Sequence, residues 1–157
     1  MMKRIYVAGG CFWGVQGYFK TIKGIKFSTV GYANSIFNNP SYKEVKTGKT
    51  NAVETTELYY DESVISLEQI IEKLLAVIDP TALNFQDVDY GTQYRNGIYY
   101  EIDSDYEIIK NTLNRLAKNY SKPIVTENKK LENYFLAEEY HQDYSDKNPS
   151  VACHIKF

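Results

Sequence analysis

The apolar positions along the chain follow two different periods, and their alternation predicts strands interleaved with amphipathic helices. Alternating or β-branched composition, bounded by glycine and polar residues, is typical of strands. It occurs in five segments: residues 3–8, 26–33, 53–61, 96–102 and 122–127.

Helical spacing of apolar side chains appears between these strands. The first predicted helix covers residues 12–22. A second begins after Ser66, because Ser66 and Gln69 have the spacing of a capping box. The same spacing after Ser104 predicts a third helix that runs to about residue 120. The apolar faces of the first two helices consist of Phe12, Val15, Phe19 and Ile22, and of Leu67, Ile70, Ile71, Leu74, Leu75 and Ile78.

Three long stretches follow neither period: residues 34–52, 81–94 and 129–157. Connections of this length inside a compact domain are often functional. We expect the first two to contribute to a site, and the last to lie as coil over the rest of the molecule.

The order of these elements predicts an α+β fold, a ferredoxin-like two-layer α/β sandwich with long loops and an irregular C-terminal coil. No repeat, low-complexity segment or linker divides the 157 residues. We therefore expect residues 1–157 to form a single domain with a sizeable core.

The charge balance argues against a nucleic-acid-binding surface, because the formal net charge is -2 and Lys and Arg are not clustered. No apolar run approaches the roughly 20 residues of a membrane-spanning helix. The N-terminal residues resemble a first strand more than a signal peptide, which points to the cytoplasm.

Thiols are kept reduced in the cytoplasm, so the two cysteines, Cys11 and Cys153, are candidates for transient redox chemistry. The chain has neither a CxxC pair nor a Cys/His cluster, which argues against a metal site. Its 15 tyrosines identify nothing by their number alone.

Cys11 comes directly after the first predicted strand, at the start of the first predicted helix. Unpaired amide groups and the helix dipole stabilise an anion there, so the thiolate is favoured. Gly9 and Gly10 allow a sharp turn and leave room near the sulfur, while Phe12 and Trp13 place apolar surface beside it. The alternative is that Cys11 is a small buried hydrophobe, which is the usual role of an isolated cysteine.

The segment "GGCFWG" is similar to the signature of the methionine sulfoxide reductase A family, the peptide-methionine (S)-S-oxide reductases. The resemblance extends through "NNPSYKEVKTGKTNAVETTELYYD", "DVDYGTQYRNGIYY", "KPIVTE" and "YHQDYSDKNP", in the family's order and over nearly the whole chain. Enzymes of this kind reverse the oxidation of methionine, one enzyme for each sulfoxide epimer.

The resemblance implies a role for each matched residue. Cys11 is the expected nucleophile and Glu54 the expected acid. Phe12 and Trp13 would form an apolar pocket for the substrate methyl group. The sulfoxide oxygen would be hydrogen-bonded by Tyr42 and Tyr94, and Asp89 would help to hold the substrate. The resemblance also implies a monomer that needs no metal and no organic cofactor.

The chemistry itself requires an acid, because a sulfoxide sulfur becomes electrophilic only as its oxygen gains a proton. Glu54 suits this role if a partly apolar site raises its pKa. In an alternating strand Glu54 shares a face with Leu58 and Tyr60, which supports such a site. The alternative is a solvated glutamate on an edge strand.

The reaction leaves a sulfenic acid on Cys11, which condenses readily with a second thiol. Cys153 is the only other thiol in the chain, and "NPSVACHI" resembles the ending of some family members. The resemblance therefore implies a disulfide between Cys11 and Cys153, opened by thiol exchange with thioredoxin. The alternative is an incidental cysteine. Either free or protein-bound methionine-S-sulfoxide is the expected substrate.

Some positions depart from the family pattern. Many members have Gly-His-Ala-Glu where this chain has Asn51, Ala52, Val53 and Glu54, so the surroundings of the acid are expected to differ. Some members have a further cysteine at the position of Lys46, or two near the C-terminus, so this chain implies a single disulfide.

Two other functions remain open from the sequence. A cysteine hydrolase or acyl transferase would pair Cys11 with His141 or His154. A thiol redox sensor or a peptide-binding module would use Cys11 or the aromatic residues without turning over a sulfoxide. A histidine within hydrogen-bond reach of Cys11 would favour the hydrolase.

Overall fold

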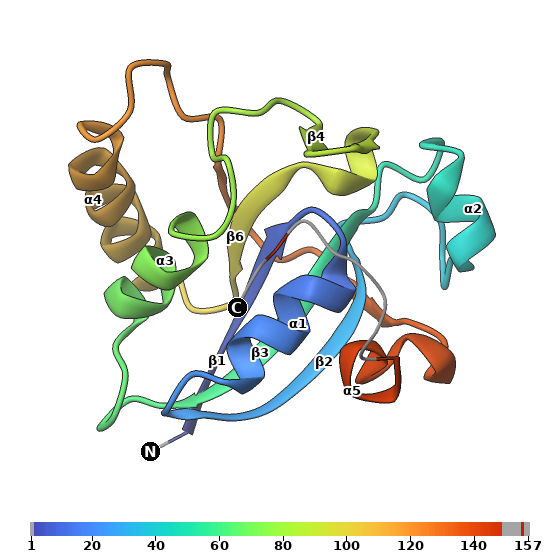
Figure 1. The fold of residues 1–157 in the computed structure, drawn as a ribbon, viewed down its shortest axis with the longest axis horizontal. Helices are drawn as coiled ribbons and strands as arrows, with labels where there is room; N and C mark the ends of the chain where they lie inside the picture. Colours follow the sequence, from blue (N-terminus) through green and yellow to red (C-terminus); the bar gives the residue numbers. More distant parts are fainter. Residues whose placement is uncertain (1, 149–154, 156–157) are drawn as a thin grey trace.

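The computed structural model describes residues 2–148 and residue 155. Its centre is a six-stranded sheet with the order β7-β6-β1-β3-β2-β8; Figure 1 shows β6, β1, β3 and β2 side by side. Neighbouring strands are antiparallel except for β6 and β7. The strands are β1 (Met2–Gly9), β2 (Ile25–Ala33), β3 (Val53–Asp61), β6 (Asn96–Tyr100), β7 (Glu127–Lys130) and β8 (Tyr134–Leu136).

Helices α1 (Phe12–Lys20) and α3 (Leu67–Leu75) cover one face of this sheet, and α4 (Asp105–Ala117) packs beside α3 (Figure 1). The chain order β1-α1-β2-β3-α3-β6 with the strand order β6-β1-β3-β2 is ferredoxin-like, so the predicted α+β sandwich is confirmed. The shorter elements are α2 (Tyr42–Lys46), β4 (Phe85–Gln86), β5 (Asp89–Tyr90), η1 (Thr92–Tyr94), η2 (Glu139–His141) and α5 (Tyr144–Lys147).

The main core lies between the helices and the sheet. The predicted capping box at the start of α3 is present, with Ser66 and Gln69 exchanging hydrogen bonds of 3.1 and 2.9 Å. Each large side chain that is fully buried here contributes about 1.5–3 kcal/mol. The core side chains from α3 and the sheet include Leu67, Ile70, Ile71, Leu74, Ile5, Val7, Leu58 and Ile98.

Strand β3 is buried on both faces. Its even-numbered positions, such as Leu58, contact the helix layer, while Val53 and Glu57 face the other side of the sheet. Glu57 accepts hydrogen bonds from Tyr6 and Thr29 at 2.9 and 3.0 Å, which compensates for the burial of its carboxylate. β3 is therefore an interior strand, with β1 on one side and β2 on the other.

Several predicted boundaries differ from the structure. The first helix ends at Lys20, and the third covers Asp105–Ala117. Ser104 has helical dihedral angles and makes no side-chain cap, because a capping hydroxyl needs an extended backbone to reach the next turn. The strand predicted at 122–127 is displaced to β7, whose pairing with β6 begins at Glu127.

The long stretches contain short elements that their composition did not predict. The capping box of α2 begins at Ser41 within the 34–52 connection. Beyond residue 128, strand β8, η2 and α5 are joined by irregular backbone. Within the described residues, no helix is long and apolar enough to cross a membrane.

Candidate active site

Cys11 lies at the predicted turn from strand to helix, as the residue that precedes the first turn of α1. Gly10 has a φ of +90°, a conformation that glycine adopts without strain. Gly9 is needed for a different reason than sequence suggested, since a Cβ there would approach Ile78 to 2.8 Å. The half-exposed Cys11 therefore stands at the positive end of a helix, where a thiolate is stabilised.

Glu54 is brought to the same place by β3. Its side chain is buried, with 1% exposure, and Oε1 accepts a hydrogen bond of 3.3 Å from the Phe12 amide. Oε2 has no hydrogen-bond partner in the part of the chain that the structure describes. The alternative of a solvated glutamate on an edge strand is wrong, because β3 is an interior strand.

The pKa of Glu54 is raised to about 8, mainly by burial, with a smaller contribution from the negative charge of Asp89. The Phe12 amide and the positive charge of Lys46 act in the opposite direction. At neutral pH the carboxyl group is therefore mainly protonated, with one oxygen available to donate. A proton donor within reach of a thiolate is what sulfoxide reduction requires.

Tyr42 on α2 and Tyr94 on η1 face this carboxyl group from two irregular stretches of the chain. Burial raises the pKa of Tyr42 to about 12, helped by the charges of Glu54 and Cys11 and opposed by a hydrogen bond with Tyr94. The pKa of Tyr94 is also raised, by burial and then by Glu54 and Tyr42. Both hydroxyls therefore remain protonated and able to donate at physiological pH.

Asp89 lies on β5, in the β4–β5 hairpin. Its charge raises the pKa of both Glu54 and Tyr94, so its carboxylate is close to both. The hairpin is held by Gln86, which hydrogen-bonds the backbone amide and carbonyl of Asp79 at 2.9 and 2.7 Å. Asp89 thus belongs to the same cluster as Glu54 and Tyr94.

An apolar wall is formed beside Cys11 by Phe12 and Trp13. Phe12 is buried, and its ring centroid lies 5.2 Å from that of His141. Trp13 stacks on Tyr144 with centroids 3.7 Å apart and planes at 9°, and its Nε1 donates to Nδ1 of His141 at 2.9 Å. Trp13 is thereby fixed in one orientation, and the wall is suited to a methyl group.

The role of His141 in the structure is therefore to accept the hydrogen bond from the Trp13 indole. Because Nδ1 accepts from Trp13, the neutral ring carries its proton on Nε2, which has no hydrogen-bond partner among the described residues. Burial lowers the pKa of His141, against the opposing charge of Glu138. Neither ring nitrogen hydrogen-bonds Cys11, so the hydrolase dyad through His141 is wrong; His154 lies outside the described residues.

Glu138, which sequence analysis did not single out, joins two parts of this site. Its Oε1 accepts from the Tyr32 hydroxyl at 2.8 Å, and its Oε2 accepts from the Tyr42 amide at 3.0 Å. Glu138 thus fixes the start of α2, which carries Tyr42. The contact spans 96 residues, and no local sequence signal indicates it.

The departure at Asn51 has a structural explanation. Asn51 has a φ of +56°, in the left-handed region, where asparagine is tolerated better than most residues. Glycine, which many family members have at this position, also adopts the left-handed region without strain.

The predicted resolving residue, Cys153, lies outside the described residues. Ile155, two positions later, is described and is buried in the main core, with 4% exposure. The chain is thus anchored close to Cys153 in sequence.

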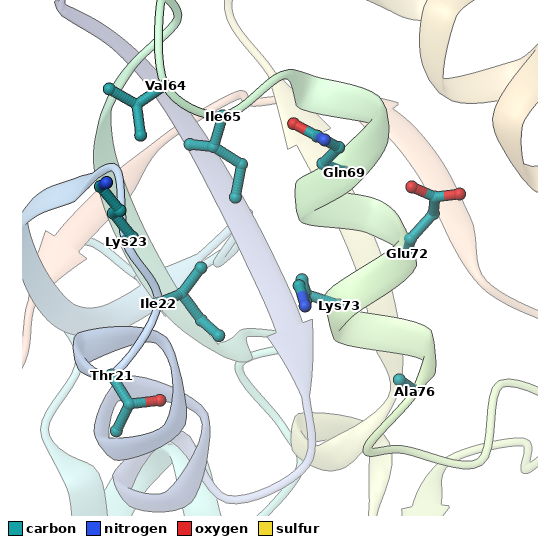
Figure 2. A pocket seen from close by; sticks show the side chains of 9 residues that line it. All are labelled: Thr21, Ile22, Lys23, Val64, Ile65, Gln69, Glu72, Lys73 and Ala76. Carbon is teal, nitrogen blue, oxygen red and sulfur yellow. The ribbon is translucent and has the colours of Figure 1, made fainter.

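A groove of about 650 Å³ lies away from this cluster, between the end of α1 and helix α3 (Figure 2). Its walls are formed by Ile22, Ile65 and the side chains of Gln69 and Lys73, and none of the predicted site residues lines it.

No group of three or more His, Cys, Asp or Glu side chains in residues 2–148 and 155 is arranged to hold a metal ion.

Comparisons with known proteins agree with the geometry. The family model described as "Peptide methionine sulfoxide reductase" matches residues 3–157. The peptide methionine sulfoxide reductase MsrA of Metamycoplasma arthritidis is 58% identical over 156 residues, which is 99% of this chain and 100% of that protein.

Solved structures show the same fold. Reduced Mxr1 from Saccharomyces cerevisiae has a TM-score of 0.95 and 32% identity, over 99% of this chain and 92% of that one. Mxr1 in complex with Trx2 has a TM-score of 0.68 and 21% identity, over 99% and 88% of the two chains. This chain belongs to the peptide methionine sulfoxide reductase family.

Proposed function

We propose that this protein is a thiol-dependent oxidoreductase that reduces methionine-S-sulfoxide, with Cys11 as nucleophile and Glu54 as general acid. One observation carries the proposal: a buried glutamate, protonated at neutral pH, is hydrogen-bonded to the residue that follows a cysteine at a helix start. The proton donor that the reaction needs is thus held by the backbone amide next to the nucleophile in sequence.

The Cys11 thiolate attacks the sulfoxide sulfur while Glu54 transfers its proton to the sulfoxide oxygen. The attack forms a bond between the two sulfur atoms. This bond and the sulfur–oxygen bond of the substrate then break as the oxygen forms a new bond to the Cys11 sulfur, so methionine leaves and Cys11 becomes a sulfenic acid. The substrate sulfur gains two electrons and the cysteine sulfur loses two, so the step balances without another reactant.

Substrate recognition follows from the surrounding side chains. Phe12 and Trp13 contact the methyl group, and the hydroxyls of Tyr42 and Tyr94 donate to the sulfoxide oxygen. Asp89 holds the remainder of the substrate. Ordinary methionine lacks the oxygen and cannot accept hydrogen bonds from these half-buried hydroxyls, so the product is bound less well than the sulfoxide.

The proposed cycle closes with Cys153. Its thiol condenses with the sulfenic acid, water leaves, and a disulfide with Cys11 forms. A thioredoxin dithiol then reduces this disulfide by exchange and is itself oxidised. The burial of Ile155, two residues after Cys153 in the sequence, and the existence of an Mxr1–Trx2 complex support the proposal.

We also infer that residues 1–157 form one domain that works in the cytoplasm. The central sheet contains strands from both ends of the chain, which supports a single unit. A cycle that starts from reduced thiols needs a reducing compartment, which supports the cytoplasm.

The test is stereospecific turnover. Each epimer of a peptide methionine sulfoxide is given to the wild type, Cys11→Ser and Cys153→Ser, first with dithiothreitol and then with thioredoxin. Reduction of the S epimer alone, abolished in Cys11→Ser, is expected. Cys153→Ser should keep dithiothreitol-dependent activity and lose thioredoxin-dependent cycling. A folded wild type that reduces neither epimer would disprove the function.

A further inference from the structure

Arg95 connects three segments that are far apart in the sequence. Its Nη2 donates to the Asn51 carbonyl at 3.0 Å, and its Nη1 donates to the Thr92 carbonyl at 2.8 Å. Its Nε donates to Oε1 of Glu127 at 3.0 Å. With the side chain only 14% exposed, the guanidinium is held in one arrangement by partners on three sides.

Glu127 is in turn held by the sheet. The Tyr99 hydroxyl on β6 donates to the same Oε1 at 2.6 Å. Burial opposes the ionisation of Glu127, but hydrogen bonds from Tyr99 and Arg95 and the charge of Arg95 outweigh it, so the pKa is lowered. An ionised carboxylate therefore fixes Arg95 to the rigid core of the fold.

The other two contacts of Arg95 lead to the candidate active site. Asn51, in its left-handed turn, is three residues before Glu54 and directs the chain into β3. Thr92 opens the η1 turn that carries Tyr94, and the amide of Arg95 also donates to the Thr92 carbonyl, at 3.2 Å. One guanidinium thus ties the backbone leading to Glu54 to the backbone of Tyr94.

We propose that Arg95 is a positioning residue, which holds Glu54 and Tyr94 at one fixed separation so that proton donation and oxygen binding act on the same sulfoxide. The inference rests on the proposed function and adds a residue that touches no reacting atom. A lysine carries the same charge but not the three-way fork, so the effect depends on geometry more than on charge.

The chain offers a matched control in Arg4. Its guanidinium also makes a forked pair, with Nε and Nη2 donating to Glu101 at 2.7 and 3.0 Å and Nη1 donating to Tyr59 at 2.9 Å. Arg4 lies near the start of β1, at the opposite end of that strand from Cys11. Loss of Arg4 should therefore affect stability without affecting the site.

The experiment compares Arg95→Lys, Arg95→Met and Arg4→Met with the wild type. Reduced protein is mixed with a peptide methionine-S-sulfoxide without reductant, and methionine formed in the single turnover is followed from pH 5.5 to 9.5. Thermal melting identifies variants that fail to fold. Both Arg95 variants should be slower by about 10- to 100-fold, because small displacements of reacting groups have effects of this size.

A second readout separates positioning from simple destabilisation. Asp89, Lys46, Tyr42 and Tyr94 interact electrostatically with Glu54, and Cys11 interacts with both tyrosines. The Arg95 variants change none of these groups. They do lose the contact with the Asn51 carbonyl, so the backbone that leads into β3 is less well held and water reaches the Glu54 carboxyl group. The pKa of Glu54 should then fall from about 8 toward the ordinary carboxyl range. Infrared titration, by difference from Glu54→Gln, measures this without turnover.

Arg4→Met should keep the wild-type rate and the wild-type titration of Glu54. Wild-type rates and titration in both Arg95 variants would overturn the inference, as would equal changes in Arg4→Met. If the wild type itself fails to reduce the sulfoxide, the proposed function is lost, and the infrared titration still decides whether Arg95 sets the environment of Glu54.

Discussion

Oε1 of Glu54 accepts a hydrogen bond of 3.3 Å from the backbone amide of Phe12, the residue that follows Cys11. This bond couples the end of the helix that supports the thiolate to the carboxyl group that supplies the proton. It occupies one carboxyl oxygen and leaves Oε2 to donate. The position of the acid relative to the nucleophile is therefore set by backbone, which is less mobile than a side chain.

Replacing Glu54 by glutamine should lower kcat for sulfoxide reduction by at least about 100-fold, because an amide cannot supply the proton. In the wild type, activity should decline on the alkaline side with a midpoint near the Glu54 pKa of about 8. This alkaline limb should be absent from the residual activity of Glu54→Gln. The pH dependence of kcat with dithiothreitol measures both effects.

Glu57→Gln is the control for this substitution. Glu57 lies on the same strand and is 7% exposed, but it faces the other side of the sheet and bonds Tyr6 and Thr29. Its replacement should leave the alkaline limb unchanged. An unaltered limb in Glu54→Gln would show that another group is the acid.

The raised pKa of Glu54 also predicts how the free energy of unfolding depends on pH. Glu54 keeps its proton in the folded state up to about pH 8, whereas the unfolded chain releases it in the ordinary carboxyl range. The contribution of Glu54 to the free energy of unfolding is therefore fully present below the ordinary carboxyl range. It is lost as the pH rises toward 8, at about 1.4 kcal/mol per pH unit.

Urea unfolding of the wild type and Glu54→Gln at pH 5, 6, 7 and 8 tests this contribution. Glutamine does not titrate, so the variant should gain stability relative to the wild type at each step. All other titrating groups are present in both proteins, so their effects cancel in the difference between the two unfolding free energies. A constant difference across the series would mean that the carboxyl group has an ordinary pKa.

Removal of one hydroxyl, in Tyr42→Phe or Tyr94→Phe, should lower kcat/KM by about threefold to tenfold, the size expected for one neutral hydrogen bond. The double variant should lose more than the product of the two, since no donor then remains for the oxygen. Tyr90→Phe is the control, because Tyr90 is 70% exposed. Equal kcat/KM for all of these variants would exclude the hydroxyls from oxygen binding.

Local signals in the sequence were sufficient for the parts of the site that depend on neighbouring residues. Glycine followed by apolar residues predicted the turn at Cys11, and the spacing of Ser66 and Gln69 predicted the start of α3. Alternation along 53–61 placed Glu54 on the face with Leu58, which the structure confirms.

Contacts between distant segments could not be predicted in this way. Trp13 and His141 are 128 residues apart, and Arg95 and Glu127 are 32 apart, so neither contact leaves a local pattern. The full burial of Glu54 also depends on strands on both sides of β3, which alternation within one strand does not reveal. The resemblance supplied the site residues, but not the network that supports them.

The contact between Trp13 and His141 gives a further prediction. His141→Phe keeps a ring among the aromatic side chains but removes the acceptor of the indole N–H. The indole should then sample other orientations, and the methyl pocket should fit less well. We expect KM for the sulfoxide to rise about threefold to tenfold, as for the loss of one hydrogen bond, with a smaller change in kcat.

Trp13 is the only tryptophan in the chain, so intrinsic fluorescence reports on this residue alone. His141→Phe should shift its emission, whereas Tyr144→Phe preserves the stacked ring at 3.7 Å and should not. Because burial lowers the pKa of His141, the wild type should show the same shift only well below neutral pH, when protonated Nδ1 no longer accepts. Unchanged emission and KM in His141→Phe would mean that stacking alone orients Trp13.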